Sequence, residues 1–163
     1  MPEQFQHRAR AVGIIPDGDR LLASNLSSPL LGEDPHWLWP GGRVEGEGSL
    51  EQCVVREVRE ETGLIVATER LIYVYQSVND EFAIQNAEFF FLCRVTGGRL
   101  GDWRAEDNSE QEVIRDARFL TREESGTEEI WPMAVTVRVW DDLAAGFPAV
   151  VDLGYVRRAS YED

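Results

Sequence analysis

Three glutamates lie within five consecutive residues, and helical geometry would gather them on one side of a helix. With Glu57 as the origin, Glu61 lies at about +40° and Glu60 at about −60° around the helix axis. This carboxylate patch overlaps the edge of the apolar face that includes Val54 and Val58. Like charges so arranged repel one another, and partial burial increases the cost. We therefore expect a cation among them, and Mg²⁺ or Mn²⁺ is favoured because these ions bind carboxylates and bridge to phosphates.

The residues around the glutamates carry signals for the start and the end of a helix. Ser49 fits an N-cap, and Gln52 follows it at the spacing of a capping box. Gly63 stands where a left-handed residue commonly ends a helix. Before the helix, Gly41 and Gly42 would let the backbone approach a metal ion or a phosphate closely. A solvated acidic face is the alternative for the glutamates alone, and this loop favours a binding site.

The stretch Gly42–Leu64 resembles the Nudix box, G-x5-E-x7-R-E-U-x-E-E-x-G-U, in which U is a bulky aliphatic residue. Gly42 matches the first position. The second half of the pattern matches in full, at Arg56, Glu57, Val58, Glu60, Glu61, Gly63 and Leu64. One position departs from the pattern, because Gly48 stands where the first Glu is expected. Glu45 and Glu47 are the nearby acids that could replace it.

The resemblance implies a fold, a metal site and an activity. Glu57, Glu60 and Glu61, with the backbone of Gly42, would hold Mg²⁺ or Mn²⁺, and Arg56 would pair with a carboxylate and orient it. Glu57, Glu60 and Arg56 are thus the candidate catalytic residues. The implied fold is α/β, a Nudix-type α/β/α sandwich with a mixed β-sheet between helices. The implied activity is metal-dependent hydrolysis of a phosphoanhydride bond in a nucleoside diphosphate linked to another moiety.

Further acids are candidates for an extra metal ligand or for the general base. They are Glu47, Glu88, Glu110 and Glu112. Glu88 begins an apolar, strand-like run, where an exposed acid is the commoner case. Glu110 and Glu112 lie in a long acidic segment of a kind that is usually solvated. The general base is left open between Glu57, Glu60 and a loop acid. No residue is assigned to substrate binding.

The departure at Gly48 supports a second hypothesis, a catalytically weakened Nudix-fold module that binds a nucleotide or a protein partner. Against it, all four charged residues in the second half of the box are present. The substrate is expected to be a small nucleotide-like molecule, although no motif singles out one nucleoside diphosphate derivative. The resemblance makes a homodimer a candidate assembly, on which no segment decides.

Composition indicates a single domain over residues 1–163, with a frayed C-terminal tail of about ten residues. The net charge of −14 argues against binding to nucleic acid or to an anionic membrane. No apolar run approaches the roughly 18 residues of a membrane span, and no secretory signal stands at the start. A cytoplasmic location is therefore expected. Cys53 and Cys93 are expected to be buried thiols rather than a disulfide.

Hydrophobic patterning predicts the order of the remaining elements. Strands are expected at residues 8–15, 20–24, 66–78, 88–95 and 113–120, and a helix at 133–145. Residues 16–19 are expected to form a turn, and residues 25–35 and 79–87 to form loops. Trp37 and Trp39 share one face of an extended segment, where hydrophobic cover over the sheet is favoured over stacking on a nucleobase.

Overall fold

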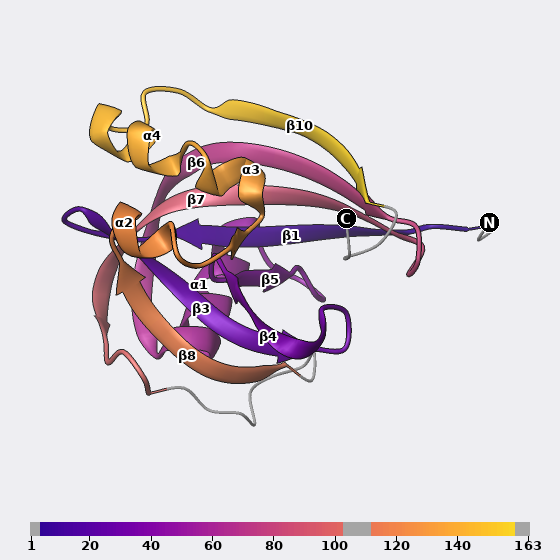
Figure 1. Ribbon diagram of the computed structural model, residues 1–163, viewed down its shortest axis with the longest axis horizontal. Helices are drawn as coiled ribbons and strands as arrows, with labels where there is room; N and C mark the ends of the chain where they lie inside the picture. The colour runs from indigo at the N-terminus through magenta and orange to yellow at the C-terminus, as the bar shows by residue number, and fades with distance from the viewer. Residues whose placement is uncertain (1–3, 103–111, 159–163) are drawn as a thin grey trace.

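The computed structural model describes residues 4–102 and 112–158, and its strands form two sheets (Figure 1). The first sheet is mixed and has the order β10-β6-β7-β1-β5. Its strands are β1 (Gln6–Ile14), β5 (Gly41–Arg43), β6 (Leu64–Asn79), β7 (Ile84–Gly98) and β10 (Val151–Arg158). Strand β1 runs parallel to β7 and antiparallel to β5. It therefore connects the glycine-rich loop directly to the centre of the sheet.

The second sheet has the order β2-β3-β4-β9, and β8 also pairs with β3. Its strands are β2 (Pro16–Asp17), β3 (Arg20–Ser28), β4 (Gly32–Leu38), β8 (Val113–Leu120) and β9 (Ile130–Trp131). The prediction of a loop over residues 25–35 is wrong, because β3 continues to Ser28 and β4 turns back beside it. The polar residues of this stretch stay extended because β3 is paired with both β4 and β8, so tertiary pairing overrides the local turn signal.

Helices cover both faces of the first sheet. Helix α1 (Leu50–Thr62) shares one core with Phe91, whereas α4 (Val139–Ala145) shares the other core with Phe90. Because Phe90 and Phe91 are consecutive in β7, their side chains point to opposite faces of the sheet. Two shorter helices, α2 (Arg122–Ser125) and α3 (Met133–Thr136), lie near α4 in Figure 1. The arrangement confirms the predicted α/β class and α/β/α layering.

Helix α1 begins and ends with the caps predicted for it. The Gln52 backbone N–H donates to Ser49 Oγ over 3.1 Å, and the Ser49 N–H donates to Gln52 Oε1 over 2.9 Å. Gly63 follows the helix with φ of 83° and donates its N–H to the carbonyl of Arg59. These contacts satisfy backbone groups that a helix leaves unpaired at its ends. They fix the rotation and the limits of the helix that carries the three glutamates.

The C-terminal part differs from the predicted single helix over 133–145. Helix α3 ends at Thr136 and α4 begins at Val139, because Arg138 has a φ of −129° that no α-helix adopts. The break follows the β-branched run Val135–Val137, which has low helix propensity. In the tail, residues 151–158 form β10 in parallel pairing with β6. Residues 159–163 lie outside the described residues.

Several smaller predictions concern the core. Trp39 packs against Trp140 with ring centroids 6.4 Å apart, which confirms its role as hydrophobic cover. Cys53 and Cys93 are free, buried thiols, and burial raises their pKa values to about 11 and about 12. The predicted loop over 79–87 is short, because β7 begins at Ile84. No helix in the part of the chain that the structure describes is long and apolar enough to cross a membrane.

Candidate active site

Helix α1 directs two of the predicted glutamates into the protein. Glu57 is 5% exposed and Glu61 is 2% exposed, as their positions beside the apolar face require. Glu61 Oε2 accepts a hydrogen bond from Ser24 Oγ over 3.0 Å and another from the Gly41 N–H over 3.3 Å. Strand β3, helix α1 and the start of β5 therefore meet at this one carboxylate.

Glu57 lies directly against the backbone of Gly42. A Cβ atom added to Gly42 would lie 2.4 Å from the carboxyl carbon of Glu57 and 2.6 and 2.7 Å from its two oxygens. No side chain larger than hydrogen leaves room for the carboxylate in this position. Cys53 Sγ lies 3.7 Å from the Gly42 carbonyl oxygen, so that carbonyl also faces α1. The first glycine of the predicted box thus forms part of the wall around Glu57.

The two oxygens of Glu61 have different surroundings. Among the described residues, Glu61 Oε1 is buried and has no hydrogen bond. Burial, followed by the charges of Glu112 and Glu57, raises the pKa of Glu61 well above its usual range. An ionised carboxylate in this place is costly unless a cation accompanies it. The orphaned oxygen, the nearby acids and the hard carboxylate donors fit a divalent cation such as Mg²⁺.

Arg56 lies beside the other two glutamates. Its Nη2 donates to Glu57 Oε1 over 3.2 Å, and its Nε lies 3.8 Å from Glu60 Oε1. The same Nη2 lies 3.4 Å from the carbonyl oxygen of Arg43 in β5. Arg56 can therefore hold the carboxylate of Glu57 in place while its own side chain remains 42% exposed. Glu60 is the least buried of the three glutamates.

The three glutamates do not form a ready-made cage. Within residues 4–102 and 112–158, no three His, Cys, Asp or Glu side chains are gathered at the spacing of metal ligands. Mg²⁺ does not require such a cage, because it commonly binds through one or two carboxylates and keeps water or substrate phosphate as further ligands. Glu61 and Glu57 are the buried carboxylates available for such an ion.

The four additional acids have different surroundings. Glu88 lies within β7 and is 9% exposed, which contradicts the expectation of an exposed acid at a strand start. It pairs with Arg10 Nε over 3.3 Å. Glu112 is half-buried, and its charge acts on Glu61. Glu47 is exposed in the loop before α1, and Glu110 lies outside the described residues.

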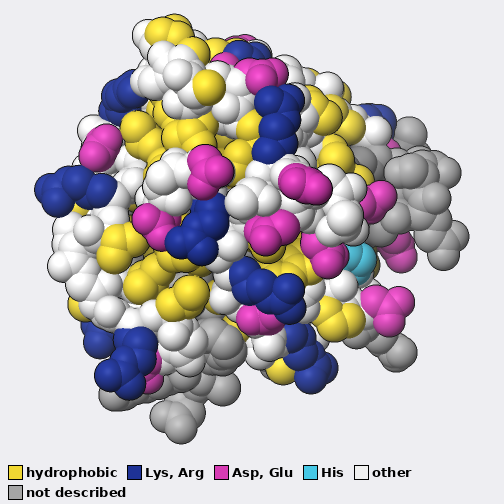
Figure 2. Space-filling view, turned by 60° about the vertical axis from the view of Figure 1, so that its left-hand side comes forward, with side chains coloured by type: hydrophobic (Ala, Val, Ile, Leu, Met, Phe, Trp, Pro, Cys, Tyr) yellow, Lys and Arg dark blue, Asp and Glu magenta, His cyan; other side chains and the backbone are white. Residues whose placement is uncertain are grey.

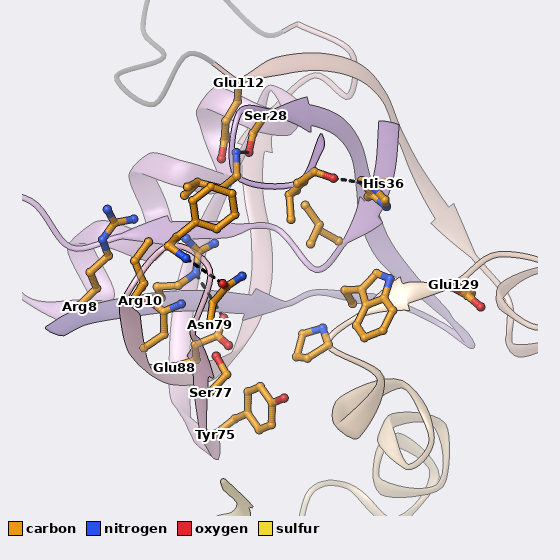
Figure 3. A pocket seen from close by; sticks show the side chains of 18 residues that line it. Arg8, Arg10, Ser28, His36, Tyr75, Ser77, Asn79, Glu88, Glu112 and Glu129 are labelled. Atoms are coloured by element: carbon orange, nitrogen blue, oxygen red, sulfur yellow. Dashed lines mark hydrogen bonds and ion pairs between the residues drawn. The ribbon is translucent and has the colours of Figure 1, made fainter. Parts of the chain in front are cut away.

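A pocket beside these acids was not predicted from the sequence. Its volume is about 210 Å³, and its wall includes Arg10, Glu88 and Glu112 (Figure 3). The remaining wall comes from β1, β4, β6, β7, the β3–β4 connection and the segment around β9. Apolar residues such as Leu30, Phe82 and Trp131 contribute to it. Since these elements are far apart in the chain, no local pattern could have identified the pocket.

Comparison with known proteins identifies the family. The family model for the NUDIX domain matches residues 6–138. An ADP-ribose pyrophosphatase from Methanocaldococcus jannaschii is 34% identical to the chain over 120 residues, which cover 72% of this chain and 68% of that protein. The chain belongs to the Nudix family. A putative 8-oxo-dGTP diphosphatase from Bacillus subtilis is 40% identical over 65 residues, which cover 40% of this chain and 41% of that protein.

Solved structures show the same fold. A NUDIX hydrolase from Nitrosomonas europaea superposes with a TM-score of 0.68 at 20% identity, covering 90% of this chain and 94% of that one. A UDP-X diphosphatase gives a TM-score of 0.64 at 20% identity, covering 93% of this chain and 67% of that one. At this level of identity the likeness establishes the Nudix fold and leaves the substrate open.

Gly48, the departure from the Nudix box, has a conformational explanation. Its φ is +134°, a value that side-chain-bearing residues rarely adopt. A Cβ added there would also lie 3.0 Å from Gln52 Oε1, the side chain that completes the cap of α1. A glutamate at this position would therefore strain the backbone and disturb the cap. The loop of this chain is built around glycine at the position where the family pattern has an acid.

Proposed function

We propose that this chain hydrolyses a phosphoanhydride bond in a nucleoside diphosphate linked to another moiety, with Mg²⁺ or Mn²⁺ as cofactor. The observation that carries the proposal is the burial of Glu57 and Glu61 against the Gly41–Gly42 backbone, with one Glu61 oxygen unpartnered among the described residues. The names of the relatives, ADP-ribose pyrophosphatase and putative 8-oxo-dGTP diphosphatase, support a diphosphate as the scissile group.

The residues of the site have separate tasks in this proposal. Ser24 and the Gly41 N–H hold Glu61 Oε2, so Oε1 would be the oxygen available to a cation. Arg56 holds Glu57, and Gly42 leaves room for its carboxylate. A cation bound to these carboxylates would neutralise phosphate charge and help to position the attacking water. In-line attack at phosphorus then depends mainly on positioning and electrostatic stabilisation.

The proton of the attacking water needs an acceptor near these carboxylates. Glu57 and Glu60 are candidates, and Glu112 is the candidate among the additional acids because its charge already acts on Glu61. Glu88 is less suitable, since its carboxylate is already engaged in an ion pair with Arg10. These candidates are distinguished by replacing each acid with its amide and measuring the pH–rate profile of each variant. Only the variant that lacks the general base should lose the acidic limb of the profile.

The proposal is tested by Mg²⁺-dependent product release from a panel that contains ADP-ribose, UDP-sugars and 8-oxo-dGTP. Glu57→Gln and Glu61→Gln should each lower turnover by about 100-fold or more, the order expected when one main electrostatic stabiliser is removed. Glu51→Gln is the matched control, because Glu51 is an exposed acid on the first turn of the same helix. Its turnover should stay within about twofold, as for an ordinary surface substitution.

The alternative function, a module that binds without turnover, predicts a different result. Wild type would then be inactive on the whole panel while still binding Mg²⁺ and nucleotide by calorimetry. Loss of Mg²⁺ binding in Glu61→Gln would still locate the metal site in that case. Full activity in both glutamate variants would contradict the proposed roles of these carboxylates.

A further inference from the structure

The turn between β3 and β4 forms one side of the pocket. It comprises residues 28–31, and Ser28, Leu30 and Leu31 line the pocket from it. The Leu30 N–H donates to Ser28 Oγ over 3.2 Å, and the Leu31 N–H donates to the Ser28 carbonyl oxygen over 3.1 Å. Because both hydrogen bonds lie within the turn, they fix its shape and not its orientation against the rest of the pocket wall.

The strand pairing that would orient this turn is interrupted. Ser28 lies opposite Gly32 and Leu26 lies opposite His36, so two steps along β3 match four steps along β4. The extra residues of β4 include Pro35, which has no N–H to donate to a neighbouring strand. Irregularities of this kind redirect a side chain and are common beside active sites. In β4, the side chain that follows the irregularity is that of His36.

His36 reaches back to the turn. Its Nε2 lies 2.9 Å from the carbonyl oxygen of Leu31, and Nε2 is the donor in this contact, because a carbonyl oxygen can only accept. Figure 3 shows the contact as a dashed line beside the pocket, and His36 itself forms part of the pocket wall. The His36 side chain therefore supplies the contact across the hairpin that the interrupted pairing does not.

The pocket adjoins the proposed metal site. Glu112 is part of its wall, and the charge of Glu112 acts on Glu61. A substrate whose phosphates lie at the carboxylates of α1 therefore places the rest of the molecule beside this pocket. Leu30 and Leu31 offer apolar surface to that part of the substrate.

We propose that His36 is a positioning residue for substrate binding. Its hydrogen bond to Leu31 holds the β3–β4 turn so that Leu30 and Leu31 contact the part of the substrate that is remote from the scissile bond. This inference rests on the proposed function for the assignment of a substrate to the pocket.

The proposed role affects binding rather than the chemical step. The β3–β4 turn and helix α1 are separate elements, so contacts with the turn have the same strength in the bound substrate and in the transition state. The loss of such uniform binding raises KM and leaves kcat unchanged.

Steady-state kinetics with the preferred panel member tests the inference in two variants. His36→Leu removes the donor, and KM should rise about three- to tenfold, the effect of one lost hydrogen bond. The kcat of this variant should stay within about twofold of wild type. In His36→Gln, the terminal amide nitrogen has nearly the same reach as Nε2 and can donate to the Leu31 carbonyl. Its KM should therefore return to within about twofold of wild type.

His7→Leu is the matched control, because His7 is exposed in β1 and lies outside the pocket wall. Its KM should stay within about twofold of wild type, as for an ordinary surface substitution. A purely structural role for His36 would lower the unfolding temperature without changing KM at temperatures where the variant is folded. If His36→Leu does not fold, as judged by thermal unfolding, His36→Asn takes its place, because the shorter amide cannot reach Leu31. An unchanged KM in the variant that lacks the contact, or an equally raised KM in His36→Gln, would overturn the inference.

The outcomes separate this inference from the proposed function. If wild type hydrolyses nothing on the panel, calorimetric titration with ADP-ribose and a UDP-sugar in Mg²⁺ buffer compares the same variants. Binding that weakens in His36→Leu and recovers in His36→Gln would then support the inference and contradict the hydrolase. Hydrolysis with a KM that ignores His36 would do the reverse, and a wild type that neither hydrolyses nor binds any panel member would overturn both.

Discussion

At the scale of single residues, the position of Glu57 depends sterically on the absence of a side chain at Gly42. A Cβ atom added to Gly42 would lie only 2.4 Å from the carboxyl carbon of Glu57, which is too close for both to be accommodated. Because that carboxyl is the end of a flexible side chain, the protein can accommodate a methyl group by moving it. The consequence of a substitution should therefore appear in catalysis before it appears in stability.

Gly42→Ala is accordingly expected to fold normally and to lose about 10- to 100-fold in turnover, the usual effect of a disturbed metal environment. Urea unfolding measures the first property, and hydrolysis of the preferred panel member measures the second. Gly97→Ala is the control, since its added Cβ would meet only Ile65 at 3.8 Å. Undiminished turnover in Gly42→Ala would show that the observed position of Glu57 is not needed.

Glu61 makes the stability of the metal-free chain dependent on pH. Its pKa is raised above the ordinary value of 4.5, first by burial and then by the charges of Glu112 and Glu57. At pH values well below 4.5 the Glu61 carboxyl is protonated in both the folded and the unfolded state, so its ionisation does not reduce the free energy of unfolding. As pH rises from there to the folded pKa, the unfolded chain ionises first, so the free energy of unfolding falls and then stays low.

Glu61→Gln should therefore flatten this decline in urea unfolding measured across a pH series with EDTA present. Adding Mg²⁺ to wild type above the folded pKa should recover stability, because the ion binds only the folded site. The exposed Glu51→Gln should keep the wild-type profile. A decline of equal steepness in wild type and Glu61→Gln would contradict the assignment.

The sequence allowed some of these residues to be predicted and not others. The inward direction of Glu57 and Glu61 follows from helical spacing and two cap signals, all within one short stretch. Ser24 could not be predicted, because it reaches Glu61 from 37 positions away. The pocket was missed for the same reason, since strand register brings its lining residues together.

At the scale of elements, α4 is attached to the sheet by a polar network. Tyr73 Oη donates to Asp142 Oδ2 over 2.5 Å, and Arg138 Nε contacts the same oxygen over 2.7 Å. Arg70 of β6 donates to the carbonyl oxygens of Gly146 and Phe147 and so binds the end of the helix. The prediction of one long helix missed this arrangement, because these partners lie on a distant strand.

Asp142→Asn should lower the free energy of unfolding at neutral pH by about 1–2 kcal/mol, after allowance for the partial exposure of Arg138. The Arg138 hydrogen bond, with Tyr73, lowers the Asp142 pKa. The carboxylate therefore contributes above its unfolded pKa, and the contribution is lost as pH falls through the folded pKa. The difference between variant and wild type should shrink in acid urea titrations.

Asp141→Asn is the matched control for this network. Asp141 is 71% exposed and pairs with Arg122, which is 62% exposed, so its loss should cost less than about 0.5 kcal/mol. Equal effects of the two substitutions would show that α4 does not depend on the Tyr73 contact.

At the scale of the whole molecule, an excess of negative charge surrounds a site proposed for an anionic substrate. The net charge is −14. On the face in Figure 2, acidic and basic side chains nevertheless lie interspersed. The pocket itself includes Arg8 and Arg10 beside its acids. The net negative charge therefore repels an anionic substrate at long range, whereas the pocket arginines attract it locally. Salt distinguishes the two effects, because it screens exposed charges over about 8 Å at physiological ionic strength.

Raising NaCl at fixed Mg²⁺ should lower KM for the preferred substrate, because the long-range repulsion is screened more than contacts within the pocket. Steady-state kinetics over a salt series, with ionic strength set by NaCl alone, measures this. A KM that rises with salt would instead show that the arginines dominate the encounter.

Strand β1 fixes the spacing between two parts of the site, because it pairs with a strand on each side. It pairs with β7 on one side and with β5 on the other, so that Arg10 lies opposite Glu88 and the next residue, Ala11, lies opposite Gly42. A strand cannot slip by one residue without turning its side chains to the other face. The distance between Glu88 in the pocket wall and the glycine-rich loop is thus fixed by backbone geometry.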